Sequence, residues 1–123
     1  MKAPQPTEKQ LQSCIIDYWL QFRLPGTCVA AIPNQRAFGQ PGLQRGLPDL
    51  LCYGGSWPMK GITIYIELKV GKNKLSEHQV TIRDEMIAAG VPHFVCRTFE
   101  EAHDILVRYG ICKPVTKLAR RAA

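Results

Sequence analysis

Three charged residues stand where two apolar segments begin or end. Asp49 follows Pro48 and precedes "LLCY", while Glu67 and Lys69 close the isoleucine-rich segment "ITIYIELK". Because the side chains of a strand alternate between its two faces, Glu67 and Lys69 should share a face. If the intervening "GGSWPMKG" is a turn, Asp49 meets Glu67 at one edge of the sheet, and facing carboxylates repel unless a cation lies between them. Mg²⁺ accepts carboxylates while it keeps waters and binds phosphate, so this spacing favours a divalent-cation site.

The same three residues also have ordinary structural explanations. Glu67 and Lys69 could form a weak ion pair on a solvent-exposed strand face. Asp49 could simply belong to a turn, because Pro-Asp is a common turn dipeptide.

Glu8 is a further acid whose position is less expected. It precedes Leu11 by three residues and Ile15 by seven, so it lies on the apolar stripe of an expected helix. From there it could turn toward the sheet as a metal ligand, directly or through a water molecule, or as an acceptor beside the ligands. The alternative is a surface acid that suits the positive end of the helix dipole.

Gln79 heads another stripe, formed by Ile82, Met86 and Ala89, and should therefore face inward. It also stands three residues after Ser76, which is the spacing of a capping box. Both explanations, an active-site group and a helix cap, stay open.

The elements that must position these residues follow from periodicity and from capping and turn residues. Strands are expected at 27–32, 49–53, 62–69 and 93–96, and helices from Thr7 to about 22, from Ser76 to about 89, and from Thr98 to about 110. The second and third strands should form an antiparallel hairpin, and the helix before the fourth strand should be a crossover that makes that strand parallel. The prediction is an α/β fold with a mixed sheet of the α+β type, flanked by helices.

Composition indicates one domain with a real core. The chain has 123 residues, of which 46% are hydrophobic, and it has neither a membrane-length apolar run nor a signal-peptide core. We therefore expect a soluble, cytoplasmic protein without a membrane partner. Five dispersed cysteines without metal-site spacing are expected to be reduced core thiols, namely Cys14, Cys28, Cys52, Cys96 and Cys112.

The charge distribution suggests a polyanionic partner such as nucleic acid. The net charge is +6, and residues 113–123 contribute four basic groups and no acid. A second basic excess lies in residues 36–74. The alternative is the solvated basic surface of an ordinary soluble protein. Residues 1–112 are thus the expected domain, and residues 113–123 a basic, mobile tail.

Together these motifs resemble a known family. Pro48-Asp49 followed by Glu67-Leu68-Lys69 resembles the PD-(D/E)xK nuclease superfamily, which has a restriction-endonuclease-like core. The early Glu8, "GLPDL", "IELK" and "GKNKLSEHQ" together resemble its VRR-NUC branch, the virus-type replication-repair nucleases. The resemblance runs from Glu8 to Tyr109.

The resemblance implies metal-dependent hydrolysis of DNA. Asp49, Glu67 and the Leu68 backbone carbonyl would hold Mg²⁺ or Mn²⁺, with help from Glu8. Lys69 would orient or activate the attacking water, and Gln79 would be a further active-site group. Basic and polar loop residues could grip flanking phosphates, unless they are only ordinary loop polarity: Asn34, Arg36, Arg45, Lys72 and Lys74.

Small members of this branch, of the size found in phages, resemble structure-selective endonucleases that act as homodimers on four-way (Holliday) junctions. For a phage-encoded protein the setting would be the bacterial or host-cell cytoplasm. Paired incisions need two matching sites, which a two-fold dimer provides. The alternatives are a flap- or nick-type repair nuclease, and a non-catalytic DNA-binding module that keeps the fold.

Overall fold

The computed structural model describes residues 5–33, 41–55 and 57–115. Its elements are α1 (Glu8–Phe22), β1 (Cys28–Ala31), β2 (Leu50–Tyr53), β3 (Thr63–Leu68), α2 (Glu77–Ala88), β4 (His93–Cys96) and α3 (Phe99–Arg108). The predicted order of helices and strands is confirmed. The strands are one or two residues shorter than expected, except β4.

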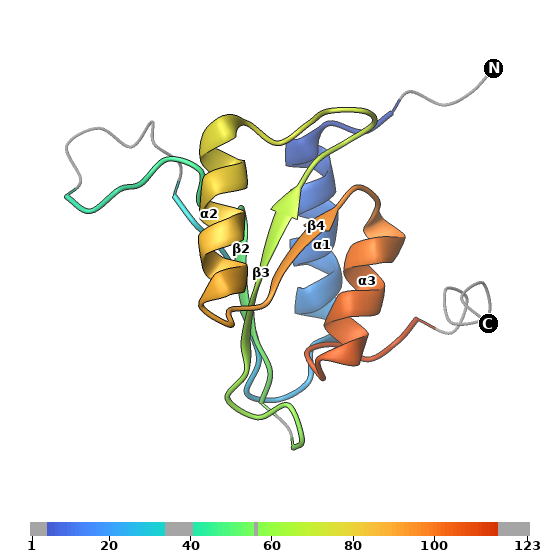
Figure 1. Cartoon of the computed structure of the whole chain (residues 1–123). Helices are drawn as coiled ribbons and strands as arrows, with labels where there is room; N and C mark the ends of the chain where they lie inside the picture. Colours follow the sequence, from blue (N-terminus) through green and yellow to red (C-terminus); the bar gives the residue numbers. More distant parts are fainter. Residues whose placement is uncertain (1–4, 34–40, 56, 116–123) are drawn as a thin grey trace.

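The four strands of the described residues form one sheet in the order β1-β2-β3-β4. β1 pairs antiparallel with β2, and β2 pairs antiparallel with β3, so the predicted hairpin is confirmed. β3 pairs parallel with β4, as a crossover through α2 requires. The result is a mixed sheet of α+β type with helices around it, which is the fold class that the sequence predicted (Figure 1).

The core lies between the sheet and two of the helices. α1 and α3 contact each other, and their buried residues join those of the strands in one cluster, with Ile15, Leu50, Ile64, Ile66 and Leu106 fully buried. Burial of apolar surface stabilises the folded state by about 25 cal/mol per Å², so the burial of these large side chains is the main stabilising contribution here.

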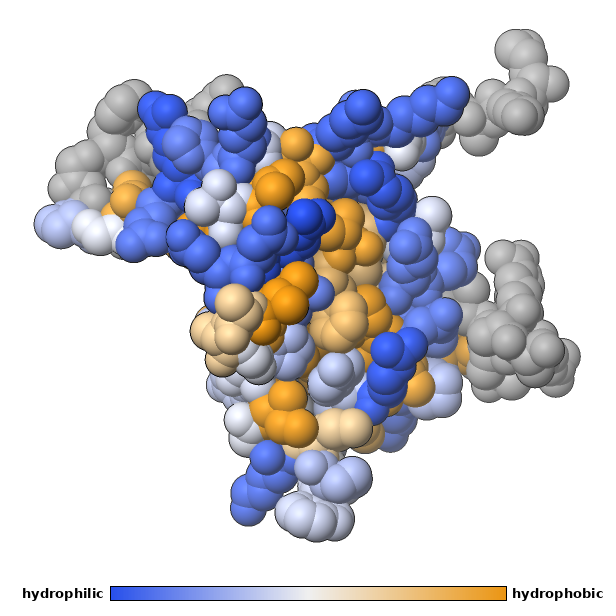
Figure 2. Space-filling view, in the orientation of Figure 1, coloured by the Kyte–Doolittle hydropathy of each residue, from blue (hydrophilic) through white to orange (hydrophobic). Residues whose placement is uncertain are grey.

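α2 differs from the other helices because none of its residues, all of which are described, is buried. The predicted inward stripe is wrong at Ala89, which is exposed and caps the helix C-terminus instead. Hydrophobic side chains consequently remain visible between α2 and α3, over β4 (Figure 2). The start of α2 is stabilised locally by a capping box.

The cysteine prediction needs a correction in the middle of α1. All five cysteines are free. Cys52, Cys96 and Cys112 are buried and Cys28 is half-buried, but Cys14 is exposed because it lies beside the apolar stripe of α1 rather than on it. Burial is the main reason why the pKa values of the three core thiols are raised to about 12, so they stay protonated.

The first residues of the predicted tail contact the helices. Lys113 donates its backbone N–H to the Phe22 carbonyl at 2.9 Å, its own carbonyl accepts from the Tyr18 hydroxyl, and the Val115 N–H donates to His103 Nε2 at 3.3 Å. Residues 116–123 lie outside the described residues, and the division into a domain and a mobile tail stays a prediction. No helix among the described residues is long and apolar enough to cross a membrane.

Candidate active site at the open end of the hairpin

The end of the hairpin opposite its turn brings Asp49 and Glu67 together. Leu50 pairs with Ile66, so Asp49 faces Glu67 in the continued register. Asp49 Oδ2 accepts a hydrogen bond from the Leu68 backbone N–H at 2.7 Å. The Asp49 carboxylate is therefore fixed against the end of β3 rather than turned out to solvent, and the simple turn explanation does not describe it.

Pro48 explains why the sheet opens here. It faces Leu68 in the same register, where an ordinary residue would donate its N–H to the Leu68 carbonyl. Proline has no N–H to donate, so the ladder ends, and Asp49 takes the Leu68 N–H instead. Because the carbonyl and N–H of one strand residue point to the same side, the Leu68 carbonyl is directed toward the chain that bears Asp49, where Pro48 offers it no N–H.

Glu67 is an acid in an unusual place. Only 2% of its surface is exposed, and its Oε1 atom has no hydrogen-bond partner among the described residues. Burial is the main cause that raises the pKa of Glu67 to about 9; the neighbouring Asp49 and Glu8 raise it further, and the Lys69 ammonium acts in the opposite direction. The solvent-exposed strand face is therefore wrong for Glu67.

Lys69 joins this pair to α1. Its side chain is only 12% exposed, and its Nζ lies 3.8 Å from Oε1 of Glu8, at the first turn of α1. Glu8 thus turns toward the sheet. We call Glu8, Asp49 and Glu67, with Lys69 beside them, the carboxylate cluster.

A cavity of about 520 Å³ opens beside the cluster. Glu8 and Asp49 form one part of its lining, and Arg45, His78 and Gln79 form another. Acidic and basic or polar side chains therefore face the same space, an arrangement that can hold a phosphate group together with a cation.

The donor set fits a hard divalent cation. Two facing carboxylates, a buried carboxylate oxygen without a partner and a carbonyl at the end of a ladder are all oxygen ligands, as Mg²⁺ and Mn²⁺ prefer. Among the described residues, three or more Asp, Glu, His or Cys side chains do not gather into a complete metal site. Water and substrate would therefore supply the remaining ligands, and Glu8 would act through Lys69 or through water.

Comparison with known proteins supports this architecture. No protein-family model matches the chain, and no curated protein matches it. Solved structures do match it. One, described as a "VRR_NUC domain", is 22% identical, with 82% of this chain and 94% of that chain covered and a TM-score of 0.58. Another, described as a "VRR_NUC domain protein", is 17% identical, with 94% and 99% covered and a TM-score of 0.67.

The chain has the VRR-NUC fold. The resemblance drawn from the motifs is thereby confirmed at the level of the fold.

Within this VRR-NUC fold, Gln79 both caps α2 and lines the cavity. Its Oε1 accepts from the Ser76 N–H at 2.9 Å, so the capping box is confirmed, and its side chain also lines the cavity. The two are compatible because the amide oxygen serves the cap while the amide nitrogen remains a donor. A catalytic role for Gln79 stays a prediction.

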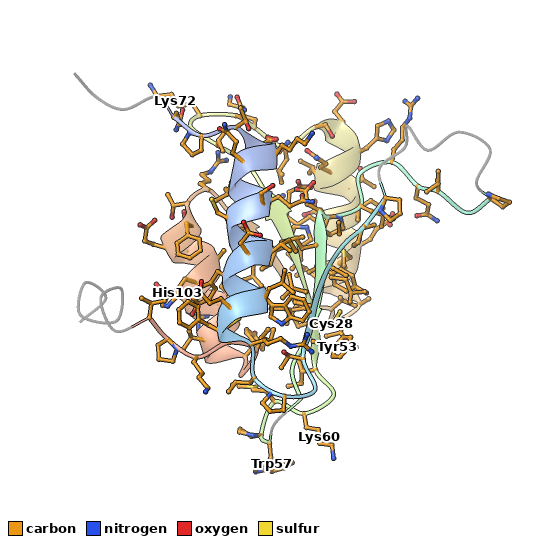
Figure 3. The ribbon with its side chains drawn as sticks, turned by 180° about the vertical axis from the view of Figure 1, so that it is seen from behind. Cys28, Tyr53, Trp57, Lys60, Lys72 and His103 are labelled. Atoms are coloured by element: carbon orange, nitrogen blue, oxygen red, sulfur yellow. The ribbon has the colours of Figure 1, made fainter. Side chains whose placement is uncertain are left out.

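The expected DNA contacts fall into two places. Arg45 lines the cavity beside Asp49, whereas Lys72 and Lys74 are exposed on the loop between β3 and α2. Figure 3 shows Lys72 at the end of the molecule where α1 begins. Asn34 and Arg36 lie outside the described residues.

Two residues of this region were missed by the sequence patterns. His78 lines the cavity, and its place one residue before Gln79 in the first turn of α2 could have shown it. Arg97 donates to the carbonyls of Gly71 and Asn73 at 3.1 and 2.7 Å, and so ties down the loop that carries Lys72. Its partners are more than twenty residues away in sequence, so no local signal exists.

Proposed function

We propose that this chain is a Mg²⁺- or Mn²⁺-dependent DNA endonuclease that hydrolyses phosphodiester bonds. The observation that carries the proposal is the buried Glu67 carboxyl, facing Asp49 at the open end of a hairpin and leaving one oxygen without a partner. Leaving a buried polar atom unsatisfied costs roughly 1–3 kcal/mol, and a cation with a phosphate substrate would recover it. The VRR-NUC fold and the basic net charge of +6 point to the same class of substrate.

Each residue has a distinct part in this proposal. Asp49, Glu67 and the Leu68 carbonyl would hold the cation. A divalent cation bound there would stabilise negative charge on the phosphate and lower the pKa of an attacking water. Lys69, held by Glu8 on a mostly buried stem, would orient that water and offset charge as the pentavalent phosphorus forms.

The cavity wall would position the strand to be cut. Arg45 can pair with a phosphate next to the scissile one, and the Gln79 amide nitrogen can donate to a non-bridging oxygen. Lys72 and Lys74 would contact phosphates farther along, which gives affinity without sequence reading.

We propose further that the preferred substrate is a four-way DNA junction, cut by a homodimer in the cytoplasm. This part depends on the resemblance to small VRR-NUC nucleases and on the geometry of paired incisions, which two sites related by a two-fold axis can make.

The test is cleavage of matched DNA substrates that share their arm sequences: a four-way junction, a flap, a nicked duplex and an intact duplex. We expect cleavage in Mn²⁺ that EDTA abolishes, fastest on the junction. Inactivity on every substrate would reject the nuclease, while equal cleavage of flap and junction would reject only the junction preference.

A mixing experiment tests the dimer. Wild type mixed with excess Asp49→Ala protein should nick junctions in one strand instead of resolving them, because mixed dimers hold one intact site. If junction resolution instead depends only on the concentration of wild-type protein, and not on the excess of variant protein, each copy works alone.

A further inference from the structure

A second surface with its own chemistry lies at the turn end of the hairpin. Trp57 is 87% exposed, the most exposed large hydrophobic side chain among the described residues. Four exposed basic residues lie on the hairpin turn itself and on the two segments that contact its base. We call these five residues the basic end: Arg23, Trp57, Lys60, Arg108 and Lys113.

Two segments are joined there through the backbone. Leu24 donates its N–H to the Ile111 carbonyl, Arg23 forms a β-bridge with Cys112, and Lys113 donates to Phe22. The end of α1 is thereby joined to the chain that follows α3.

The hairpin turn is seated on both of these segments. A Cβ at Gly54 would lie 2.6 Å from the Tyr109 carbonyl oxygen, and a Cβ at Gly55 would lie 2.6 Å from that of Pro25. Only glycine permits this approach. The turn therefore projects Trp57 and Lys60 from a firmly packed base, at the end of the molecule opposite Lys72 (Figure 3).

The charge at this end has one sign. The described residues of 22–28, 53–62 and 108–115 include Arg23, Lys60, Arg108 and Lys113 but neither Asp nor Glu. The nearest acids along α1 and α3, Asp17 and Asp104, lie one helical turn or more away. An exposed indole on segments that carry basic residues and no acid matches nucleic acid, since bases stack on aromatic rings while lysine and arginine neutralise phosphates.

We propose that the basic end is a second DNA-binding surface, on which Trp57 stacks against an unpaired base of single-stranded or branched DNA. The proposal deepens the nuclease function and rests on it for the identity of the polymer. β3 separates the two ends by about 20 Å, or roughly six base pairs, so one DNA molecule can reach both only if it extends past that length.

The binding test avoids catalysis altogether. Wild-type protein in EDTA is titrated with single-stranded dT20 and with a 20-base-pair blunt duplex while tryptophan fluorescence and anisotropy are followed. We expect dT20 to quench the emission of Trp57 and the duplex to quench it less. Trp57→Phe should remove the quenching but keep most of the affinity, because phenylalanine still stacks.

Trp57→Ala should weaken dT20 binding about tenfold, and Lys60→Ala should lower the slope of log affinity against log salt by about one. Leu20→Ala, which changes another exposed apolar residue, is the matched control and should bind as wild type does. Thermal unfolding checks that each variant is folded.

Two results would overturn the proposal. One is a Trp57→Ala protein that binds dT20 as tightly as wild type. The other is Trp57 emission that changes with protein concentration but not with DNA, which would show that a second copy covers the indole. Because the binding test does not measure cleavage, its result stands even if the protein proves not to be a nuclease. Conversely, a protein that cleaves DNA but whose Trp57 does not respond to DNA rejects only the second binding surface.

Discussion

The two ends of one β-hairpin place their charged residues in opposite environments, buried at one end and exposed to solvent at the other. At the open end, Asp49 and Glu67 are held against the sheet, and Glu67 is 2% exposed. At the turn end, Lys60 and Trp57 stand in solvent, Trp57 at 87% exposure. A buried acid costs free energy when it is ionised and also when one of its oxygens has no hydrogen-bond partner, whereas exposed charge costs little. The carboxylate cluster is therefore a place where folding alone leaves a cost, and the basic end is not.

That contrast predicts where substitutions abolish cleavage and where they only weaken binding. Asp49→Ala, Glu67→Ala and Lys69→Ala should each lower single-turnover cleavage of junction DNA by about 100- to 1,000-fold, since each removes a group that acts on the transition state. Glu77→Ala, an exposed acid in the first turn of α2, is the control and should stay near wild type. A loss of cleavage activity in Lys60→Ala as large as that in Lys69→Ala would contradict this difference between the two ends.

Two glycines sharpen the comparison through the backbone. Gly46 has φ +86°, and an added Cβ would collide with the His78 carbonyl at the start of α2; Gly61, in the hairpin turn, has φ +81° but open space around it. Gly61→Ala should cost only the conformational strain, about 1–2 kcal/mol, and Gly46→Ala about 2–4 kcal/mol because the loop bearing Asp49 must also move. Urea unfolding measures both. Equal losses would show that the loop does not need its close contact with α2.

The pH dependence of stability tests the buried acid. Glu67 has an ordinary pKa of 4.5 when unfolded and one of about 9 when folded. Between these values the unfolded chain releases a proton that the folded chain keeps, so the free energy of unfolding should fall as pH rises, by at most about 1.4 kcal/mol per pH unit. In EDTA, Glu67→Gln should therefore be more stable than wild type at pH 8 by about 1–3 kcal/mol, and nearly equal to it at pH 5.

A divalent cation should cancel or reverse the stability advantage of Glu67→Gln over wild type at pH 8. At pH 8, Mg²⁺ or Mn²⁺ at about 100 times its Kd should stabilise wild type by about 2.7 kcal/mol, because it binds only the folded state, and should leave Glu67→Gln almost unchanged. Calorimetric melting with and without EDTA measures this. Equal stabilisation of both proteins would place the cation elsewhere.

The smallest expected effects distinguish two helix caps. Ser76→Ala and Thr98→Ala each remove a side chain that caps a helix, so each should cost about 1 kcal/mol of stability. Only Ser76→Ala should also slow cleavage, because it loosens the turn that carries Gln79 and His78 into the cavity. Comparison of unfolding free energies with cleavage rates separates the two, and parallel slowing by Thr98→Ala would argue against a specific part for this turn.

The sequence alone was sufficient for the order of the elements, for the hairpin of β2 and β3 and for the parallel β4, but it did not predict how β1 pairs. Strand alternation in "ITIYIELK", the capping pairs at Thr7 and Ser76, and the crossover length before "HFVC" are local signals, and local signals decide helix or strand. They also placed Asp49, Glu67 and Lys69 at the same end of two neighbouring strands, since the register of a hairpin follows from the pattern of its two strands.

What only the tertiary structure decided is how each of these groups is solvated. No pattern in the sequence says that Glu67 is buried with an unpartnered oxygen, that Lys69 reaches Glu8 across the fold, or that Arg97 holds a loop more than twenty residues away. Nor could composition show that Trp57 and four basic residues from three segments gather at one end. Backbone conformation depends on near neighbours in the chain, whereas burial and charge environment depend on residues that only folding brings close.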